Sequence, residues 1–137
     1  MPNHFVSLAD FSGEELRALL GLAHDVKRNP RAYKDACQGQ TLAMIFQKPS
    51  LRTRVSFQTG IYQLGGQGLY LGPTDIQLHR GETIADTAAV LSRYVDGIMA
   101  RVFGHSDIVD LAAHASVPVI NGLSDFNHPC QVLADLQ

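Results

Sequence analysis

Residues 48–54 (Lys-Pro-Ser-Leu-Arg-Thr-Arg) place basic and hydroxyl side chains around a predicted helix start. Three of the chain's 11 Lys and Arg residues fall within these seven positions. Ser50 is a favourable N-cap for this helix. We expect the backbone N–H groups of Leu51, Arg52 and Thr53 to point outward from the helix start, beside guanidinium groups. Together these donors would form a site for a dianion such as phosphate. The alternative is an ordinary capped helix with a solvated basic first turn. Basic residues there oppose the helix dipole, however, and this cost favours the anion site.

Two further polar side chains are candidates for the same chemistry. Arg101 ends a predicted strand over residues 97–102, and it is either a surface charge or a second anion ligand beside the Ser50 loop. His128 opens a predicted helix at residues 130–137, with Pro129 as its first residue, and could donate to a carbonyl oxygen, with Gln131 on the same helical face. The alternative for a lone His before Pro is a structural cap. Cys130 has no separate base partner, which favours a buried packing thiol over a nucleophile.

Other motifs are absent or uninformative by spacing. The chain contains neither a Walker loop nor a Gly-x-Gly-x-x-Gly after a strand, so nucleotide-cofactor sites lose their usual support. Gln77 and residues 80–82 lie in a polar loop that spacing alone describes only as mobile. The remaining histidines show no metal-ligand spacing, so the sequence predicts no metal site.

Strand and helix patterns alternate along the chain and predict an α/β fold. Residues 41–46 form a continuous apolar run of strand length, typical of a strand covered on both faces, and shorter strands are expected at 68–71, 97–102 and 117–120. Helices are expected from Ser12 to Asn29, at 51–64, from Thr83 to Val95 and from Ser106 to Ala115. This order predicts a three-layer sandwich with a central parallel sheet of about four strands and helices on both faces. The candidate residues fall beyond the carboxyl ends of these strands, where such sheets bind ligands.

Length and composition support one domain and exclude several classes of protein. The 137 residues are 45% apolar, and the net charge is 11 − 13 = −2. This balance excludes a general nucleic-acid-binding surface and a disordered chain. No apolar stretch approaches the roughly 20 residues that span a bilayer. The N-terminus lacks a signal-peptide pattern, and two distant cysteines are typical of reduced thiols, so we expect a cytoplasmic protein without a membrane partner.

Taken together, these residues resemble the carbamoyltransferase family, and within it the ornithine branch. Residues 50–54 resemble the family's Ser-Thr-Arg-Thr-Arg signature, and residues 128–131 match the His-Pro-Cys-Gln of the ornithine branch. Residues 77–82 (Gln-Leu-His-Arg-Gly-Glu) and 91–96 (Leu-Ser-Arg-Tyr-Val-Asp) are also similar to that branch. The resemblance runs from about Phe5 to Gln137.

The resemblance implies that eight residues bind carbamoyl phosphate: Ser50, Leu51, Arg52, Thr53, Gln77, Arg101, His128 and Gln131. It also implies that Arg101 and His128 take part in catalysis. Gln77 matches the family glutamine that reaches a neighbouring subunit, which implies a homotrimer. Leu51 stands where the family usually has Thr; its backbone N–H remains, whereas a side-chain hydroxyl is lost, and we expect altered phosphate contacts with intact chemistry.

The implied reaction transfers a carbamoyl group from carbamoyl phosphate to ornithine, giving citrulline and phosphate, without a metal or organic cofactor. Residues 1–137 would be the carbamoyl-phosphate-binding domain. The family's ornithine-binding domain would begin just past Gln137, and the chain stops within a predicted helix, as expected for a fragment. Two alternatives remain open: a carbamoyltransferase for aspartate, putrescine or acetylornithine, and a non-catalytic anion-binding module.

Overall fold

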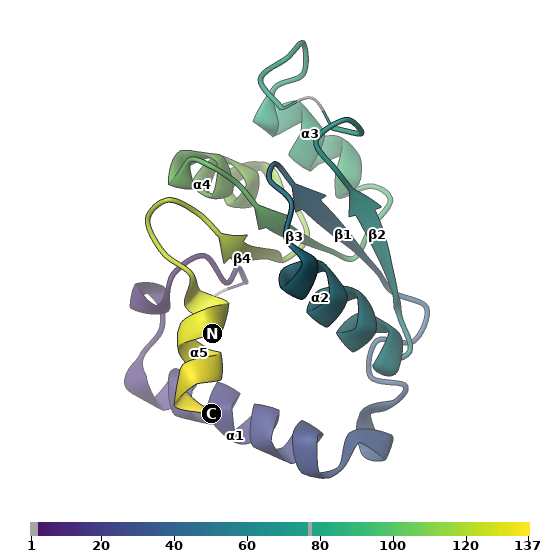
Figure 1. The fold of residues 1–137 in the computed structure, drawn as a ribbon, viewed down its shortest axis with the longest axis vertical. Coiled ribbons are helices and arrows are strands. Elements are labelled where there is room, and N and C mark those ends of the chain that lie inside the picture. The colour runs from purple at the N-terminus through teal and green to yellow at the C-terminus, as the bar shows by residue number, and fades with distance from the viewer. Residues whose placement is uncertain (1–2, 77) are drawn as a thin grey trace.

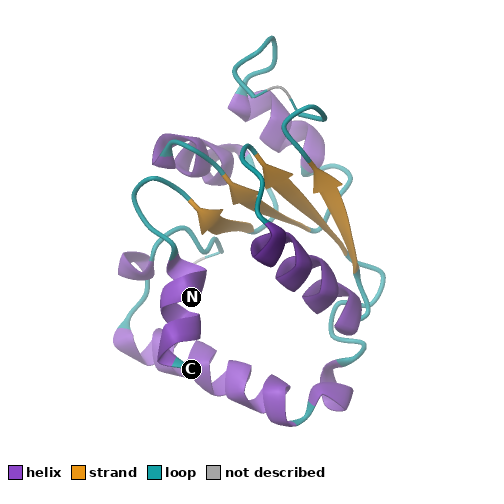
Figure 2. Cartoon of the chain, in the orientation of Figure 1, coloured by secondary structure: helices purple, strands orange, loops and turns teal. Residues whose placement is uncertain are grey.

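A four-stranded parallel sheet forms the centre of the computed structural model, which describes residues 3–76 and 78–137 (Figure 2). The strands lie in the order β2-β1-β3-β4. Their bounds are Thr41–Phe46 for β1, Gln67–Leu71 for β2, Gly97–Arg101 for β3 and Val119–Leu123 for β4. The predicted α/β fold with about four parallel strands is confirmed.

Helices cover both faces of this sheet (Figure 1). α2 covers one face, whereas α3 and α4 pack together on the other. α1 and α5 complete the fold, with two 3₁₀ turns, Leu8–Asp10 and Pro30–Tyr33, flanking α1. The helices span Gly13–Arg28 (α1), Leu51–Gln63 (α2), Ile84–Leu91 (α3), His105–His114 (α4) and Pro129–Leu136 (α5).

The central strand β1 divides its side chains between two apolar clusters. Ala43 and Ile45 belong to the cluster beneath α3 and α4, whereas Leu42, Met44 and Phe46 belong to the cluster beneath α2. All five side chains are buried. Because successive strand residues face opposite sides, a strand covered on both faces needs apolar residues at every position, which explains the uninterrupted run.

The strand order creates a crevice beside β1. From β1 the chain passes through α2 to β2 on one side of β1, and then returns through α3 to β3 on the other side. The segments that leave β1 and β3 therefore diverge to opposite faces of the sheet. Parallel sheets bind ligands at such a reversal of strand order, beyond the carboxyl ends of the strands. The Ser50 segment follows β1, and Arg101 ends β3, so both lie at this point.

Several predicted boundaries were wrong. β4 occupies Val119–Leu123 rather than residues 117–120, because Pro118 has no N–H to give to a strand ladder and the strand continues through Asn121, whose N–H donates to the carbonyl of Phe5. α3 ends at Leu91 rather than near residue 95. α4 begins at His105, with Gly104 at its N-cap rather than the predicted Ser106.

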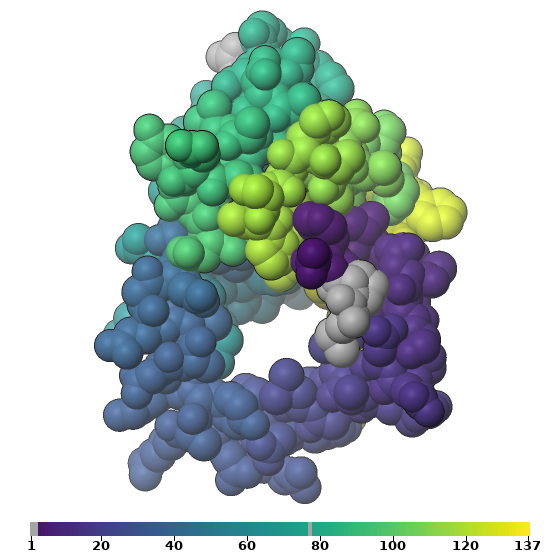
Figure 3. All heavy atoms as spheres, turned by 180° about the vertical axis from the view of Figure 1, so that it is seen from behind, coloured from purple at the N-terminus to yellow at the C-terminus, as the bar shows by residue number. Residues whose placement is uncertain are grey.

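α1 stands away from the sheet. Its predicted capping box is present, with Ser12 and Glu15 bonding each other's backbone, yet none of its residues is buried. Figure 3 shows an opening between α1 and the rest of the chain.

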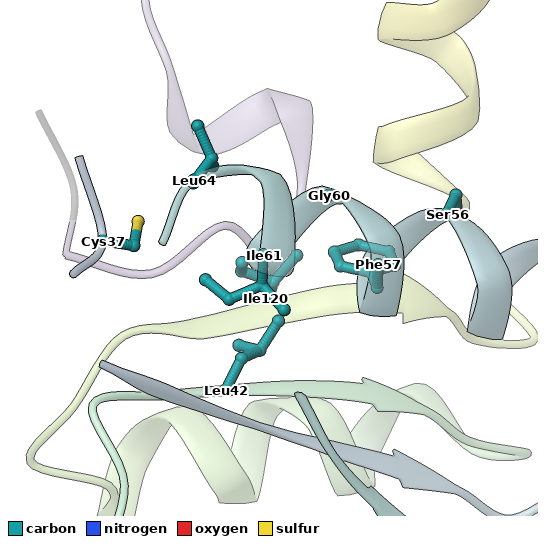
Figure 4. Close-up of a pocket in the computed structure, with 8 residues that line it drawn as sticks. All are labelled: Cys37, Leu42, Ser56, Phe57, Gly60, Ile61, Leu64 and Ile120. Carbon is teal, nitrogen blue, oxygen red and sulfur yellow. The ribbon is translucent and has the colours of Figure 1, made fainter. Parts of the chain in front are cut away.

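An apolar cavity of about 460 Å³ lies on the α2 side of the sheet, toward the amino end of β1 and so away from the crevice (Figure 4). It is lined by Cys37, Leu42, Ser56, Phe57, Gly60, Ile61, Leu64 and Ile120.

Candidate anion-binding site at the carboxyl edge of the sheet

The first turn of α2 forms one wall of the crevice. Ser50 is its N-cap, in extended conformation, and Ser50 Oγ accepts a hydrogen bond from the Thr53 backbone N–H at 3.4 Å. This bond uses the Thr53 N–H, which is one of the three backbone N–H groups that the sequence predicted to be free for an anion. The N–H groups of Leu51 and Arg52 remain, at the positive end of the helix.

Arg101 meets this turn from the end of β3. Its Nη1 donates to Thr53 Oγ1 at 3.2 Å, so the predicted proximity of Arg101 to the Ser50 loop is confirmed. Its Nε is buried and has no hydrogen-bond partner among the described residues. A buried guanidinium N–H without an acceptor is costly, and an anion in the crevice would satisfy it.

The Thr53 hydroxyl is oriented by its two neighbours. Thr53 Oγ1 accepts from Ser50 Oγ at 3.0 Å as well as from Arg101. A hydroxyl has two acceptor lone pairs and one donor hydrogen, so these two bonds leave the hydrogen available to donate. Thr53 can therefore donate to an anion that the two backbone N–H groups also reach.

The expectation that the guanidinium groups of residues 48–54 surround one anion is wrong for Arg54. The Arg54 guanidinium stacks on the ring of Tyr70, 3.7 Å from its centroid, and Tyr70 lies on β2, on the opposite side of β1 from Arg101. Lys48 Nζ lies 5.5 Å from the centroid of the Phe103 ring. Both contacts are cation–π interactions, which bare sequence spacing does not reveal. Arg52 is exposed at the helix start.

His128 lies at the N-cap position of α5, half-buried, and its side chain caps nothing. The structural-cap alternative was therefore wrong. Burial lowers the pKa of His128, the positive charge of Arg101 lowers it further, and Asp135 acts in the opposite direction. The imidazole is thus neutral at pH 7 and can donate one N–H. Its Nδ1 is buried without a partner in the part of the chain that the structure describes.

Two other residues of α5 have defined contacts. Gln131 Nε2 donates to Asp135 Oδ1 at 2.8 Å. The Cys130 thiol donates to the carbonyl of Asn121 at 3.6 Å, and burial raises its pKa to about 11. A thiol with this pKa remains protonated at neutral pH, which supports the packing role over the nucleophile.

Gln47, which sequence analysis did not single out, joins the two sides of the crevice. Its backbone N–H donates to the Arg101 carbonyl at 2.9 Å, and its Oε1 accepts from the Phe103 N–H at 2.8 Å. Its Nε2 donates to Asp107 Oδ2 at 3.4 Å, and Asp107 also contacts His79 Nε2 at 2.9 Å. These contacts join residues 28 to 60 positions apart, so no local motif could have indicated them.

Two of the predicted carbamoyl phosphate ligands, Gln77 and Leu51, have no described side-chain contact with the crevice. Gln77 lies outside the described residues, so its predicted role stays a prediction. Leu51 is 79% exposed, with its side chain toward solvent at the helix start.

Across residues 3–76 and 78–137, no group of three His, Cys, Asp or Glu side chains could hold a metal ion, and no helix is long and apolar enough to cross a membrane.

Comparisons with known proteins agree with this arrangement. Residues 3–137 match the family described as "Aspartate/ornithine carbamoyltransferase, carbamoyl-P binding domain". An ornithine carbamoyltransferase of Thermococcus kodakarensis is 67% identical over 132 residues, which cover 95% of this chain and 42% of that protein. One of Oceanobacillus iheyensis is 58% identical over 135 residues, covering 97% of this chain and 42% of that protein.

A solved structure extends the similarity to the fold. The ornithine carbamoyltransferase of Pyrococcus furiosus superposes with a TM-score of 0.94 at 57% identity, covering 98% of this chain and 44% of that chain. The chain thus spans less than half the length of the relatives it matches. The fold and these similarities confirm the resemblance: the chain belongs to the aspartate/ornithine carbamoyltransferase family, as a carbamoyl-P binding domain.

Proposed function

We propose that residues 1–137 are the carbamoyl-phosphate-binding domain of an ornithine carbamoyltransferase. The observation that carries this proposal is a pair of buried nitrogens, Arg101 Nε and His128 Nδ1, that have no hydrogen-bond partner within residues 3–76 and 78–137, together with the hydrogen bond between Arg101 and Thr53. Donors that lack partners at the reversal point of a parallel sheet are suited to an anionic ligand. The high identity to ornithine carbamoyltransferases supports carbamoyl phosphate as that ligand.

The phosphoryl group would lie at the start of α2. The backbone N–H groups of Leu51 and Arg52 and the hydroxyl hydrogen of Thr53 would donate to its oxygens, and the guanidinium of Arg52 is exposed at the same helix start. Arg101 would donate from the β3 side. Charged donors of this kind bind phosphate strongly, and they would also stabilise the charge that the phosphate takes as it leaves.

The carbamoyl oxygen would be held by His128, Arg101 and Thr53. In the reaction the δ-amine nitrogen of ornithine would bond to the carbamoyl carbon, the carbon–oxygen bond to phosphate would break, and the departing phosphate would take up the proton that the amine loses. Negative charge develops on the carbamoyl oxygen, where a neutral His128 can donate a hydrogen bond and Arg101 supplies positive charge. By analogy with oxyanion sites, each such donor contributes roughly 3–4 kcal/mol to transition-state stabilisation. Gln131 would bind the carbamoyl amide.

The complete enzyme would need more than this chain. Because the relatives are more than twice as long, we propose that ornithine binds through a further domain outside residues 1–137. We further propose a homotrimer in the cytoplasm, in which Gln77 serves a neighbouring site.

An acceptor assay on the full-length protein tests the proposed function. Carbamoyl phosphate is supplied with ornithine, acetylornithine, putrescine or aspartate in turn, and the carbamoylated product is measured. We expect citrulline from ornithine at a rate well above that of the other three. Preference for another acceptor would reassign the enzyme within its family. Binding of carbamoyl phosphate with no transfer to any acceptor would favour an anion-binding module.

A further inference from the structure

Two polar side chains of α5 follow its N-cap residue, His128. Gln131 and Asp135 are four residues apart within the helix, so they lie on the same helical face. His128 is at the N-terminal end of α5, so Gln131 is nearer to the proposed carbamoyl site than Asp135 is. Gln131 thus stands between the proposed carbamoyl site and Asp135.

The contact between Gln131 and Asp135 fixes the orientation of an amide. Gln131 Nε2 donates to Asp135 Oδ1 at 2.8 Å. An ionised carboxylate can accept hydrogen bonds but cannot donate them, so it can bind only the NH₂ end of the glutamine amide. Without Asp135, the two ends of the amide could exchange by rotation about the last side-chain bond. With Asp135, the nitrogen faces down the helix and the oxygen is left for other partners.

We infer that Asp135 is a positioning residue that presents the Gln131 oxygen to the amino group of the carbamoyl moiety. This inference rests on the proposed function and deepens it. The carbamoyl NH₂ has two donor hydrogens and no acceptor, so it needs an oxygen partner. Gln131 Oε1 supplies that oxygen most readily when its own NH₂ group is held by Asp135.

The charge of Asp135 is also felt at His128. It raises the pKa of His128, against the larger effects of burial and of Arg101. This effect accompanies the hydrogen bond to Gln131, which is the contact that carries the inference.

The inference predicts selectivity between a carbamoyl group and its methyl analogue. Two stable ligands differ only at this point: phosphonoacetamide keeps the NH₂ group, whereas acetonylphosphonate has a methyl group in its place. Inorganic phosphate has no carbamoyl group, so its affinity measures only the phosphate contacts proposed for Arg52 and Arg101. Binding of all three is measured by calorimetric titration of the full chain and its variants.

We expect Asp135→Ala to weaken phosphonoacetamide binding by about five- to tenfold, because the ligand must then order a Gln131 side chain that Asp135 no longer holds. Binding of acetonylphosphonate and inorganic phosphate should change by less than about twofold. Asp135→Asn should give an intermediate loss, because an asparagine oxygen can still accept from Gln131 while its NH₂ group permits the reversed amide. In a Gln131→Ala background, Asp135→Ala should have no further effect. Asp110→Ala, an exposed acid on α4, is the matched control.

Two results would overturn the inference. In the first, Asp135→Ala binds phosphonoacetamide as tightly as the unchanged chain does. In the second, Asp135→Ala weakens all three ligands equally, which would indicate only a structural role in α5. If the unchanged chain binds phosphonoacetamide no better than inorganic phosphate, the proposed function fails together with the inference, and this outcome differs from the other two.

Discussion

Arg101 and Thr53 are 48 positions apart in sequence and 3.2 Å apart in the fold, joined by a hydrogen bond from Nη1 to Oγ1. This bond crosses the crevice between β3 and the start of α2. It fixes the direction of two donors at once, since it orients the guanidinium and leaves the Thr53 hydrogen free for a ligand. A site prepared in this way has less side-chain ordering to do when the anion binds.

Leu51→Thr should strengthen phosphate binding. Leu51 is 79% exposed at the helix start, so a Thr side chain there meets no steric barrier and adds a hydroxyl donor at the position where the family usually has one. We expect a two- to fivefold gain in carbamoyl phosphate affinity, a small effect because the added hydroxyl lies in solvent. Leu51→Val is the matched control, because Val has the shape of Thr without the hydroxyl. Equal affinities for the Thr and Val variants would show that no ligand contact is made there.

His128 should titrate below the ordinary histidine value of about 6.5. Burial and Arg101 lower the pKa of His128 in the folded chain. NMR titration of the imidazole should show Arg101→Met raising that pKa and Asp135→Asn lowering it. A midpoint at or above 6.5, or one that Arg101→Met leaves unchanged, would contradict the electrostatic account of the site.

The same shift predicts how stability depends on pH. Because the unfolded chain binds the His128 proton more readily than the folded chain, the free energy of unfolding should fall as pH drops below about 6.5, until the folded pKa is passed. His128→Gln should remove this contribution. Chemical denaturation of both proteins at pH 7.5 and at pH 5 measures it. An equal pH dependence in the two proteins would argue against a shifted His128.

The 137-residue chain alone should form no citrulline. Carbamoyl transfer requires the amine to be held against the carbamoyl carbon, and such positioning can account for roughly 7–11 kcal/mol of a barrier. Among the described residues, the candidate site supplies donors for the phosphate and the carbamoyl group, and none is assigned to the ornithine carboxylate. Citrulline production by the isolated chain, well above the uncatalysed rate, would contradict the proposal that ornithine binds outside residues 1–137.

Much of the site's placement follows from local patterns. The apolar run from Thr41 to Phe46 indicates a buried strand, Ser50 indicates a helix start, and a parallel sheet brings the segment after β1 and the end of β3 to one edge. These three facts were sufficient to predict that Arg101 lies beside the Ser50 loop.

The remaining details depend on contacts that local sequence does not encode. Whether Arg54 reaches an anion or stacks on Tyr70 depends on how α2 sits against β2. Gln47 gains its role from the backbone of β3, and from Asp107 on α4. The end of β4 at Leu123 likewise depends on pairing with β3, where Leu123 lies opposite Arg101 and its carbonyl accepts from the Val102 N–H. Such long-range partners become apparent only when the elements are packed.

The most direct test of the anion site is the affinity of the chain for carbamoyl phosphate in three matched arginine variants. Arg101→Ala and Arg52→Ala should each weaken binding at least tenfold, a loss of about 1.4 kcal/mol. Arg54→Ala removes an equal charge from the same turn of α2, but its guanidinium lies on Tyr70, so we expect a loss of less than about threefold. Unchanged affinity in both Arg101→Ala and Arg52→Ala would contradict the assignment of this crevice as the carbamoyl phosphate site.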